Sequence, residues 1–198
     1  MAPIKYKLIK NFFNKEELKL LKIYCNRKMD LHNDFNIDQY SFSPAWYHDS
    51  FMYSLLVSKT PLVEEQTNLK LFPTYTYWRY YIFGATLMQH NDRPSCEISA
   101  SVCIEKRDDW AFEIEGESFF LEEGDAVLYA GCVHRHGRPG IYKGEGMAQV
   151  FFHYVNKNGP FSHHKYDEHF KSHNVQGTTA DMELVKKLQK EHEKNNKS

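Results

Sequence analysis

The sequence predicts a mainly β protein with flanking helices, in which short antiparallel strands form a sandwich, a jelly roll or a barrel. From about residue 71 onward, short apolar or alternating runs are separated by Gly, Pro and Asp, at intervals of roughly 8 to 12 residues. Aromatic residues make up 15% of the chain, and in short runs they favour sheet. Helical patterns precede and follow this region.

The length of 198 residues suits one domain with a substantial core. We therefore expect a single domain over residues 1–198. Its parts would be a helical N-terminal support over 1–70, a β core over about 71–156, and a C-terminal extension with a helix over 157–198.

The N-terminal support is expected to hold a short strand over residues 6–9 and two helices. Asn14, with Glu17 three residues later, forms a capping-box pattern and predicts that a helix begins there. A second helix is expected over residues 50–59. Residues 30–44 are polar and rich in turn formers, so we expect a loop that approaches or covers the functional site.

The β core contains a series of candidate strands. Gly116 and Glu117 suggest a two-residue hairpin between two of them, and residues 123–125 form another turn pattern. After the core, residues 181–194 are charged with a thin apolar stripe, which is typical of a surface helix. The candidate strands cover residues 74–82, 87–90, 98–104, 112–115, 118–121, 126–129 and 147–155.

Composition excludes several classes of protein. The 25 basic and 26 acidic residues nearly cancel, so we expect no nucleic-acid partner. No apolar run approaches the ~20 residues that cross a bilayer, and the N-terminus lacks a signal-peptide pattern, so we expect no membrane association. The four cysteines show no Cys-x-x-Cys spacing, which favours a reduced, cytoplasmic protein over a disulfide or zinc scaffold.

His90 and Asp92 form a candidate metal site. Alternate side chains of a strand point to the same face, so both can reach one ion while Asn91 points away. A later histidine, His134 or His136, would complete a triad of two histidines and one carboxylate. Such a triad leaves open positions on an octahedral iron, as in non-haem Fe(II) oxygenases.

The order of motifs resembles that of a known enzyme superfamily. Tyr81-Ile82-Phe83-Gly84 followed by His90-Asn91-Asp92 is similar to the Tyr-x-x-Gly and His-x-Asp motifs of the prolyl-4-hydroxylase-like branch of the Fe(II)/2-oxoglutarate-dependent dioxygenases. The resemblance covers about residues 70–156. It implies a double-stranded β-helix core of the jelly-roll or cupin type, with Fe(II), 2-oxoglutarate as cosubstrate, and O₂.

The resemblance also bears on the third metal ligand. His134 and His136 share strand parity, so alternation cannot separate them. His136-Gly137 resembles the His-Gly often found at the distal ligand of related oxygenases, so we expect His90, Asp92 and His136 to bind the metal. His134 remains the alternative ligand. If it does not bind the metal, we expect it beside the site or on the substrate side.

A 2-oxoglutarate cosubstrate implies a cation for its distal carboxylate, and Arg suits that geometry best. Arg138 is the first choice, with Lys143 and Arg79 as substitutes. Lys143 would have the usual spacing if His134 were the ligand. The usual positions after His136 hold no cation, since they fall on Glu145, Gly146, Met147 and Ala148.

Tyr81, Ser99 and Ser101 are also expected near the cosubstrate. Tyr81 resembles the tyrosine that bonds the cosubstrate carboxylate in prolyl-hydroxylase-like enzymes, and its parity matches Arg79. Ser99, Ser101 and Cys103 form a small, mostly polar face that alternates with apolar residues, and this face suits the interior of a cosubstrate-lined barrel.

The resemblance implies an enzyme that hydroxylates a C–H bond and releases succinate and CO₂. A peptidyl proline is the first expected substrate, and aromatic residues around Trp78, Tyr80 and Trp110 would receive a Pro-rich peptide. A free amino acid or other small metabolite is the alternative substrate. A non-catalytic, cupin-like metal-binding protein is the alternative of another class.

A second histidine cluster follows the core. It comprises His163, His164, His169 and His173 in a polar stretch without predicted regular structure. We interpret these residues as solvated loop histidines and not as a second metal site.

Overall fold

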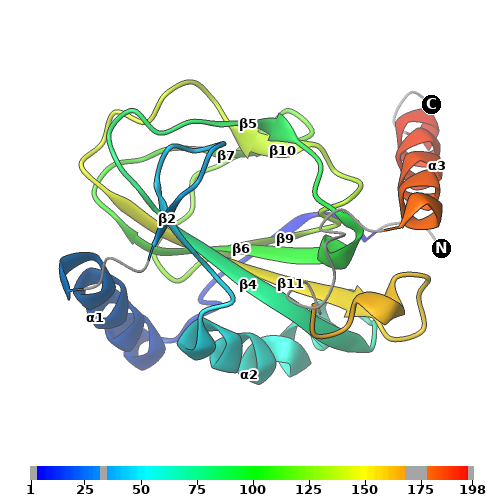
Figure 1. Ribbon diagram of the computed structural model, residues 1–198, viewed down its shortest axis with the longest axis horizontal. Coiled ribbons are helices and arrows are strands. Elements are labelled where there is room, and N and C mark those ends of the chain that lie inside the picture. Colours follow the sequence, from blue (N-terminus) through cyan, green and yellow to red (C-terminus); the bar gives the residue numbers. More distant parts are fainter. Residues whose placement is uncertain (1–3, 32–34, 168–177, 196–198) are drawn as a thin grey trace.

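Two antiparallel sheets face each other in the computed structural model, which describes residues 4–31, 35–167 and 178–195 (Figure 1). This arrangement confirms the predicted mainly β class. The larger sheet has the order β1 (Lys7–Ile9), β9 (Ala126–Tyr129), β6 (Ile98–Lys106), β11 (Met147–Asn156), β4 (Leu71–Tyr81), β3 (Pro44–Tyr47) and β2 (Asn36–Ile37). The smaller sheet has the order β5 (Leu87–His90), β10 (His136–Arg138), β7 (Phe112–Ile114) and β8 (Glu117–Phe119).

Two helices, α1 (Lys15–Leu31) and α2 (Ser50–Thr67), cover the outer face of the larger sheet (Figure 1). The main hydrophobic core lies between them and the sheet. On β6, Ile98, Ala100, Val102 and Ile104 belong to this core, whereas Ser99, Ser101 and Cys103 point to the other face. The strand alternation therefore turns a small, mostly polar face toward the smaller sheet, as the sequence predicts.

Both helices begin at side-chain caps. Asn14 Oδ1 accepts from the N–H groups of Glu16 and Glu17 at 3.0 and 2.9 Å, and Glu17 Oε2 accepts from the Asn14 N–H at 2.8 Å, which confirms the predicted capping box. Asp49 caps α2, and its side chain accepts from the N–H groups of Phe51 and Met52. Helix α2 continues past the predicted end at residue 59 and through Pro61, because buried Val63 anchors its last turns to the core.

Three short strands were not predicted. β2 and β3 lie within or beside the predicted loop over residues 30–44, where pairing with β4 and a stacked contact of 3.9 Å between Trp46 and Trp78 order the chain. β10 has three residues, too few for a periodic pattern. The predicted hairpin turn is shifted by one residue: Ile114 pairs with Glu117, so the turn is Glu115-Gly116, and both have positive φ.

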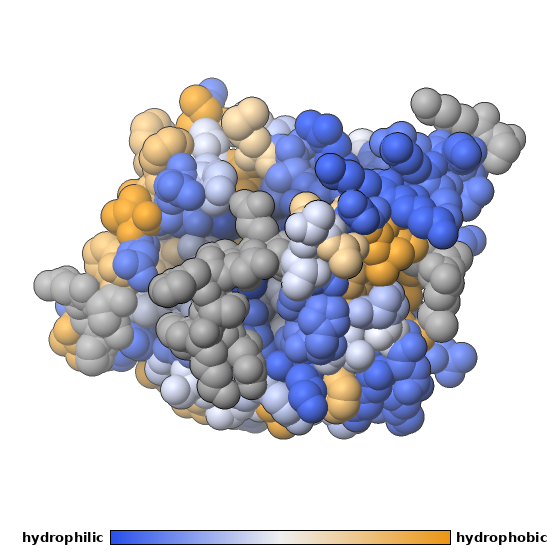
Figure 2. All heavy atoms as spheres, turned by 45° about the vertical axis from the view of Figure 1, so that its right-hand side comes forward, coloured by the Kyte–Doolittle hydropathy of each residue, from blue (hydrophilic) through white to orange (hydrophobic). Residues whose placement is uncertain are grey.

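The C-terminal helix α3 (Thr179–Asn195) packs at one end of the sheets, and buried Val185 anchors it (Figure 1). Two 3₁₀ turns, η1 (Pro94–Cys96) and η2 (Ser162–His164), complete the described elements. The surface that Figure 2 brings forward around α3 is mostly hydrophilic. Among the described residues, no helix is long and apolar enough to cross a membrane.

Candidate metal centre

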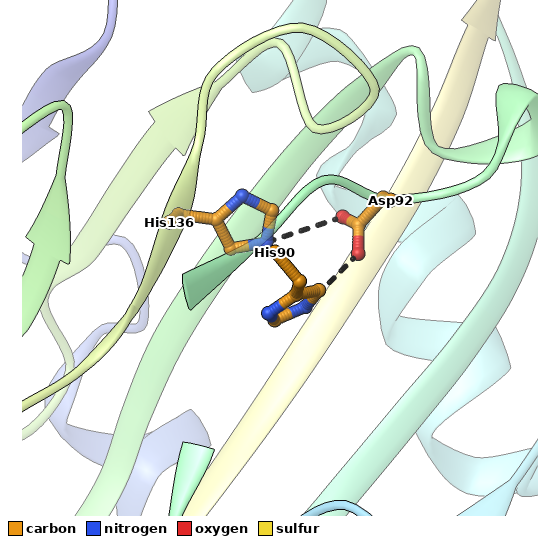
Figure 3. A group of neighbouring side chains, drawn as sticks. All are labelled: His90, Asp92 and His136. Atoms are coloured by element: carbon orange, nitrogen blue, oxygen red, sulfur yellow. Dashed lines mark ion pairs between the residues drawn. The ribbon is translucent and has the colours of Figure 1, made fainter. Parts of the chain in front are cut away.

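Three side chains converge where the smaller sheet meets the cavity between the sheets (Figure 3). His90 is the last residue of β5, and Asp92 follows two residues later. His136 is the first residue of β10 and lies opposite His90 in the antiparallel pair. His90 Nε2 lies 3.5 Å from Asp92 Oδ1, and His136 Nε2 lies 3.5 Å from Asp92 Oδ2.

Backbone carbonyls fix the orientation of the two imidazoles. Nδ1 of His90 lies 2.8 Å from the Met88 carbonyl, and Nδ1 of His136 lies 2.9 Å from the His134 carbonyl. A carbonyl can only accept, so each Nδ1 carries a proton and each ring turns its Nε2 toward Asp92. Either a proton on Nε2 or a metal ion can lie between each ring and the carboxylate, and a metal ion would bind the Nε2 lone pairs. Metal-binding histidines are held in this way.

The carboxylate itself lacks the partners that a buried acid needs. Asp92 Oδ2 is buried and has no hydrogen-bond partner among the described residues. Burial raises the pKa of Asp92, but the neighbouring His136 and His90 lower it more, so the pKa lies well below its usual value. A Cβ at Gly131 would lie 2.5 Å from Oδ2, so the glycine makes room for the carboxylate. These residues therefore fit a divalent metal ion.

A cavity of about 290 Å³ opens beside the three side chains. The three side chains lie on one wall of the cavity, so a metal ion held by them would face the open cavity. Such an arrangement would suit Fe(II) in an oxygenase, which needs open positions for a cosubstrate and O₂. The other residues around the cavity include Asp38, Tyr77, Arg79, Arg93, Phe151 and His153.

His134, the alternative ligand, points elsewhere. Its Nδ1 accepts the Ala130 N–H at 3.2 Å, and its ring packs against Tyr6 and His192. Burial lowers the pKa of His134 to about 4. His134 ends a turn whose N–H groups bond the Ala130 carbonyl, so the strand alternation that made it equivalent to His136 does not apply.

Arg138 lies two residues beyond His136, is 4% exposed, and is not among the residues that line the cavity. Its guanidinium donates to the Trp110 carbonyl and, at 2.7 Å, to Gln149 Oε1. Its Cζ lies 5.5 Å from the centre of the Tyr81 ring, and its Nε has no hydrogen-bond partner among the described residues. Burial lowers the pKa of Arg138, and no carboxylate within the described residues forms a salt bridge with it.

The other predicted cosubstrate residues are spread over three environments. Arg79 lines the cavity and Tyr81 is fully buried behind it, with 3.4 Å between Arg79 Nη1 and the Tyr81 hydroxyl. Ser101 accepts from Gln149 at 2.8 Å, and Ser99 lies 2.9 Å from His153 Nδ1. Lys143 is exposed on the loop between β10 and β11 and does not line the cavity.

The sequence did not single out several cavity residues. His153 and Phe151 follow Gln149 at alternate positions of β11, so strand parity is a signal that was available for them. Arg93 directly follows Asp92. Asp38 lies in a turn without periodicity, and only the folded chain brings it to the cavity.

The structure places His163 and His164 of the second histidine cluster next to Asp181. The Nε2 atoms of His163 and His164 lie 3.2 and 3.3 Å from Asp181 Oδ2. Asp181 also accepts the N–H and the hydroxyl of Thr178, each at 2.8 Å, at the start of α3. The carboxylate therefore has four donors and caps a helix. His169 and His173 lie outside the described residues.

No family model and no curated protein sequence matches the chain. Among solved structures it is similar to a Pseudomonas putida prolyl-4-hydroxylase, with a TM-score of 0.61 and 14% identity over 77% of this chain and 93% of the other. A 2OG-Fe(II) oxygenase family oxidoreductase from Burkholderia pseudomallei has a TM-score of 0.59 and 13% identity over 78% and 85%. The α-ketoglutarate-dependent epimerase SnoN of nogalamycin biosynthesis has a TM-score of 0.63 and 11% identity over 77% of each chain.

These similarities confirm the predicted double-stranded β-helix and, at the level of the fold, the resemblance to Fe(II)/2-oxoglutarate oxygenases. The proteins named include a hydroxylase and an epimerase, so the fold alone does not select a reaction or a substrate.

Proposed function

We propose that the chain is an Fe(II)- and 2-oxoglutarate-dependent dioxygenase that hydroxylates a C–H bond and releases succinate and CO₂. The observation that carries this proposal is the convergence on one point of the cavity wall of two oriented imidazoles and a carboxylate whose Oδ2 has no hydrogen-bond partner among the described residues. The oxygenase-like fold supports it.

In this proposal, His90, Asp92 and His136 hold the metal. Bound Fe(II), with 2-oxoglutarate and O₂, supplies the oxidising chemistry. The chain itself orients the ligands through the carbonyls of Met88 and His134 and keeps the ligands partly shielded from water. No acid or base residue of the chain is required for this class of reaction.

Arg138 is the side chain that best suits the distal carboxylate of 2-oxoglutarate. It is a buried cation without a carboxylate partner among the described residues, and such a charge is costly unless an anion joins it. Arg79 already pairs with Asp38 at 3.2 Å, and Lys143 is exposed. Tyr81 lies between the two arginines and can bond the same cosubstrate.

We favour a small-molecule substrate over a peptidyl proline, although a prolyl hydroxylase is among the similar structures. The expected aromatic groove does not form, because Trp78 and Tyr80 face the helices and Trp110 packs on Tyr142 elsewhere. All three are at most 8% exposed. A cavity of about 290 Å³ favours the alternative, a free amino acid or other small metabolite.

The first test measures succinate formed from 2-oxoglutarate by the full chain with Fe(II) and O₂. We expect formation that requires Fe(II) and is lost in His90→Ala and Asp92→Ala, whereas Lys143→Ala, which changes an exposed cation, retains it. Metal binding without succinate, across a broad panel of amino acids and peptides, would support the non-catalytic alternative.

A second test addresses the cosubstrate cation. We expect Arg138→Gln to raise the Kd for 2-oxoglutarate by at least about 30-fold, because removing one member of a buried charge pair costs about 2 kcal/mol or more. Arg79→Gln should change this Kd much less. The reverse order would assign the distal carboxylate to Arg79, and a structure with Mn(II) and N-oxalylglycine would show the contact directly.

A further inference from the structure

We propose that Arg79 and Asp38 recognise the charged head of a free α-amino acid, so that the primary substrate is a small zwitterion and not a segment of polypeptide. This inference rests on the proposed function, because it names the substrate class of the same site. The two side chains, the charge balance of the cavity and its size support it.

Arg79 extends from β4 to the cavity and is 9% exposed. Its Cζ lies 4.9 Å from the centre of the Tyr77 ring and 5.3 Å from that of Phe151. Nη2 donates to Asp38 Oδ2 at 3.2 Å, and Nη1 makes only a long contact of 3.4 Å with the Tyr81 hydroxyl. Nε is buried without a hydrogen-bond partner among the described residues, so a ligand cannot reach it. Since a guanidinium has five N–H donors, the remaining N–H groups of Nη1 and Nη2 can still bind a carboxylate of a ligand.

Asp38 brings the opposite charge to the same place, from the turn between β2 and β3. Its Oδ1 accepts from the N–H groups of Tyr40 and Ser41, at 3.1 and 2.7 Å, which fixes the side chain on its own turn. Its Oδ2 accepts from the Tyr77 hydroxyl at 2.7 Å and from Arg79. Burial raises the pKa of Asp38, but Arg79 and the hydrogen bonds lower it more, so the group is an ionised acceptor. Four donors among the described residues already reach the carboxylate, so in the proposed complex an ammonium group takes the place of the Tyr77 hydroxyl at Oδ2.

A second pair, Arg93 and Asp167, balances the charge on another side of the cavity. Nη2 of Arg93 lies 2.6 Å from Asp167 Oδ2, and Nη1 lies 3.3 Å from Oδ1. The Tyr47 hydroxyl donates to the same carboxylate. Two arginines of the core are thus offset by two aspartates from the flanking segments.

A ligand of net charge would disturb this balance. In the proposed function the charges of the metal, Asp92, 2-oxoglutarate and Arg138 also cancel. A substrate with a net charge would leave one charge uncompensated in a largely buried site, which is costly. A zwitterion adds no net charge, and its carboxylate and ammonium match the adjacent Arg79 and Asp38.

The size of the cavity points the same way. Small-molecule pockets span about 300 to 1,000 Å³, so this one lies at the lower end, and it must also hold the cosubstrate. An internal residue of a polypeptide has neither an ammonium nor a carboxylate on its backbone. It would occupy the space without using the free donors of Arg79.

The experiment uses the full chain with Fe(II), 2-oxoglutarate and each of the twenty common L-amino acids in three forms. The forms are the free amino acid, its N-acetyl derivative and its carboxamide. We expect at least one free amino acid to stimulate succinate formation at least about tenfold more than either blocked form, because each block removes a hydrogen bond between charged groups.

Two variants separate recognition from a purely structural role of the pair. Asp38→Asn should reduce the preference for the free amino acid over its N-acetyl form. Arg79→Gln should reduce the preference for the free amino acid over its carboxamide. If the pair only supports the fold, each variant should reduce the stimulation of succinate formation by all three forms equally. Arg27→Gln combined with Asp30→Asn is the matched control, since this exposed pair on α1 is 3.9 Å apart and far from the cavity.

Binding is also measured without turnover, as the shift in melting temperature that each form causes with Mn(II) and N-oxalylglycine present. Stimulation by capped peptides without response to any free amino acid overturns the zwitterion inference, while succinate formation keeps the proposed function. Absence of succinate under every condition counts against the proposed function. The melting shifts then decide the zwitterion inference, and equal or absent shifts for the three forms overturn it.

Discussion

Two clusters in this chain have the same composition, two histidines and one aspartate, and yet differ in what surrounds them. In both clusters the imidazole Nε2 atoms and the carboxylate oxygens lie within 4.8 Å of one another. His90 and His136 lie on the smaller sheet and Asp92 directly after it, all three beside a cavity. His163 and His164 lie on a 3₁₀ turn and meet Asp181 on a helix.

The difference lies in the hydrogen bonds behind each cluster. Asp181 Oδ2 accepts two bonds from Thr178, and the imidazoles of His163 and His164 are free to donate to it as well. Asp92 Oδ2 has no hydrogen-bond donor among the described residues, and the Nδ1 protons of its two imidazoles bond backbone carbonyls. Asp181 therefore stabilises a helix, whereas the site around Asp92 still fits a cation.

The largest expected effect comes from the ligands of the unsatisfied cluster. We expect His136→Ala to reduce Fe(II)-dependent succinate formation by at least about 100-fold, since even the loss of an outer partner costs 10- to 100-fold. Asp181→Asn, the matched change in the other cluster, should retain the activity. Retained activity in His136→Ala with its loss in His134→Ala would transfer the ligand role to His134.

A partly buried carboxylate, Glu97, shows what happens when donors are few and no cation among the described residues pairs with the group. It accepts the Asn156 N–H at 2.7 Å and forms no salt bridge among the described residues. Burial raises the pKa of Glu97 to about 7. The folded chain therefore keeps a proton that the unfolded chain loses, so this group stabilises the fold below about pH 4.5 and that stability is lost as the pH rises to about 7.

We expect Glu97→Gln to remove this pH dependence, because the amide oxygen can still accept from Asn156. Relative to the original chain, the variant should gain up to about 3 kcal/mol of unfolding free energy at pH 8, with little gain at pH 4. Denaturant unfolding at both pH values measures the difference. An equal gain at both would mean that Glu97 is not protonated in the folded chain.

A smaller effect is expected at the helix cap. Asp181→Ala removes the reciprocal capping box with Thr178, in which the Asp181 N–H also donates to the Thr178 hydroxyl at 3.2 Å. We expect a loss of about 1 kcal/mol of unfolding free energy, the usual cost of a lost cap, without loss of metal. Thr178→Ala is the companion variant, and its effect should not add to that of Asp181→Ala.

The smallest effect concerns metal content. We expect the full chain to bind one Fe(II) or Mn(II) per chain, and His163→Ala with His164→Ala to leave that stoichiometry unchanged. Calorimetric titration with Mn(II) measures it. A second site in the original chain that disappears in the double variant would show that the two clusters are equivalent after all.

Local sequence rules predicted the elements whose causes are local. The capping box at Asn14 depends on residues a few positions apart, and the structure has it. The structure also brings His90 and Asp92 together, but Asp92 lies beyond the end of β5 and not on the strand that the parity argument assumes. The Thr178 and Asp181 capping box has the same kind of local signal as that at Asn14. The long strands β4, β6 and β11 were also found, because each repeats its alternation several times.

Other features depend on contacts between distant segments. β2 and β3 exist because they pair next to β4, and their sequence has no alternation of its own. Asp38 lines the cavity, and Asp167 bonds Arg93 at the cavity wall, only because long-range contacts bring these segments together. His134 and His136 were indistinguishable because parity assumes a strand, whereas His134 belongs to a turn.

The positions of Asp38 and Asp167 have a consequence for how this scaffold can change. Both acids come from outside the two facing sheets, while the metal-directed side chains come from within them or from the chain directly after β5. Replacement of a few residues around position 38 would alter the sign of the charge offered to an incoming molecule without moving a single metal-directed atom. In the proposed function, the metal ligands and the residues that select the substrate thus lie in separable stretches of the chain, which makes the outer stretch the natural target for redesign.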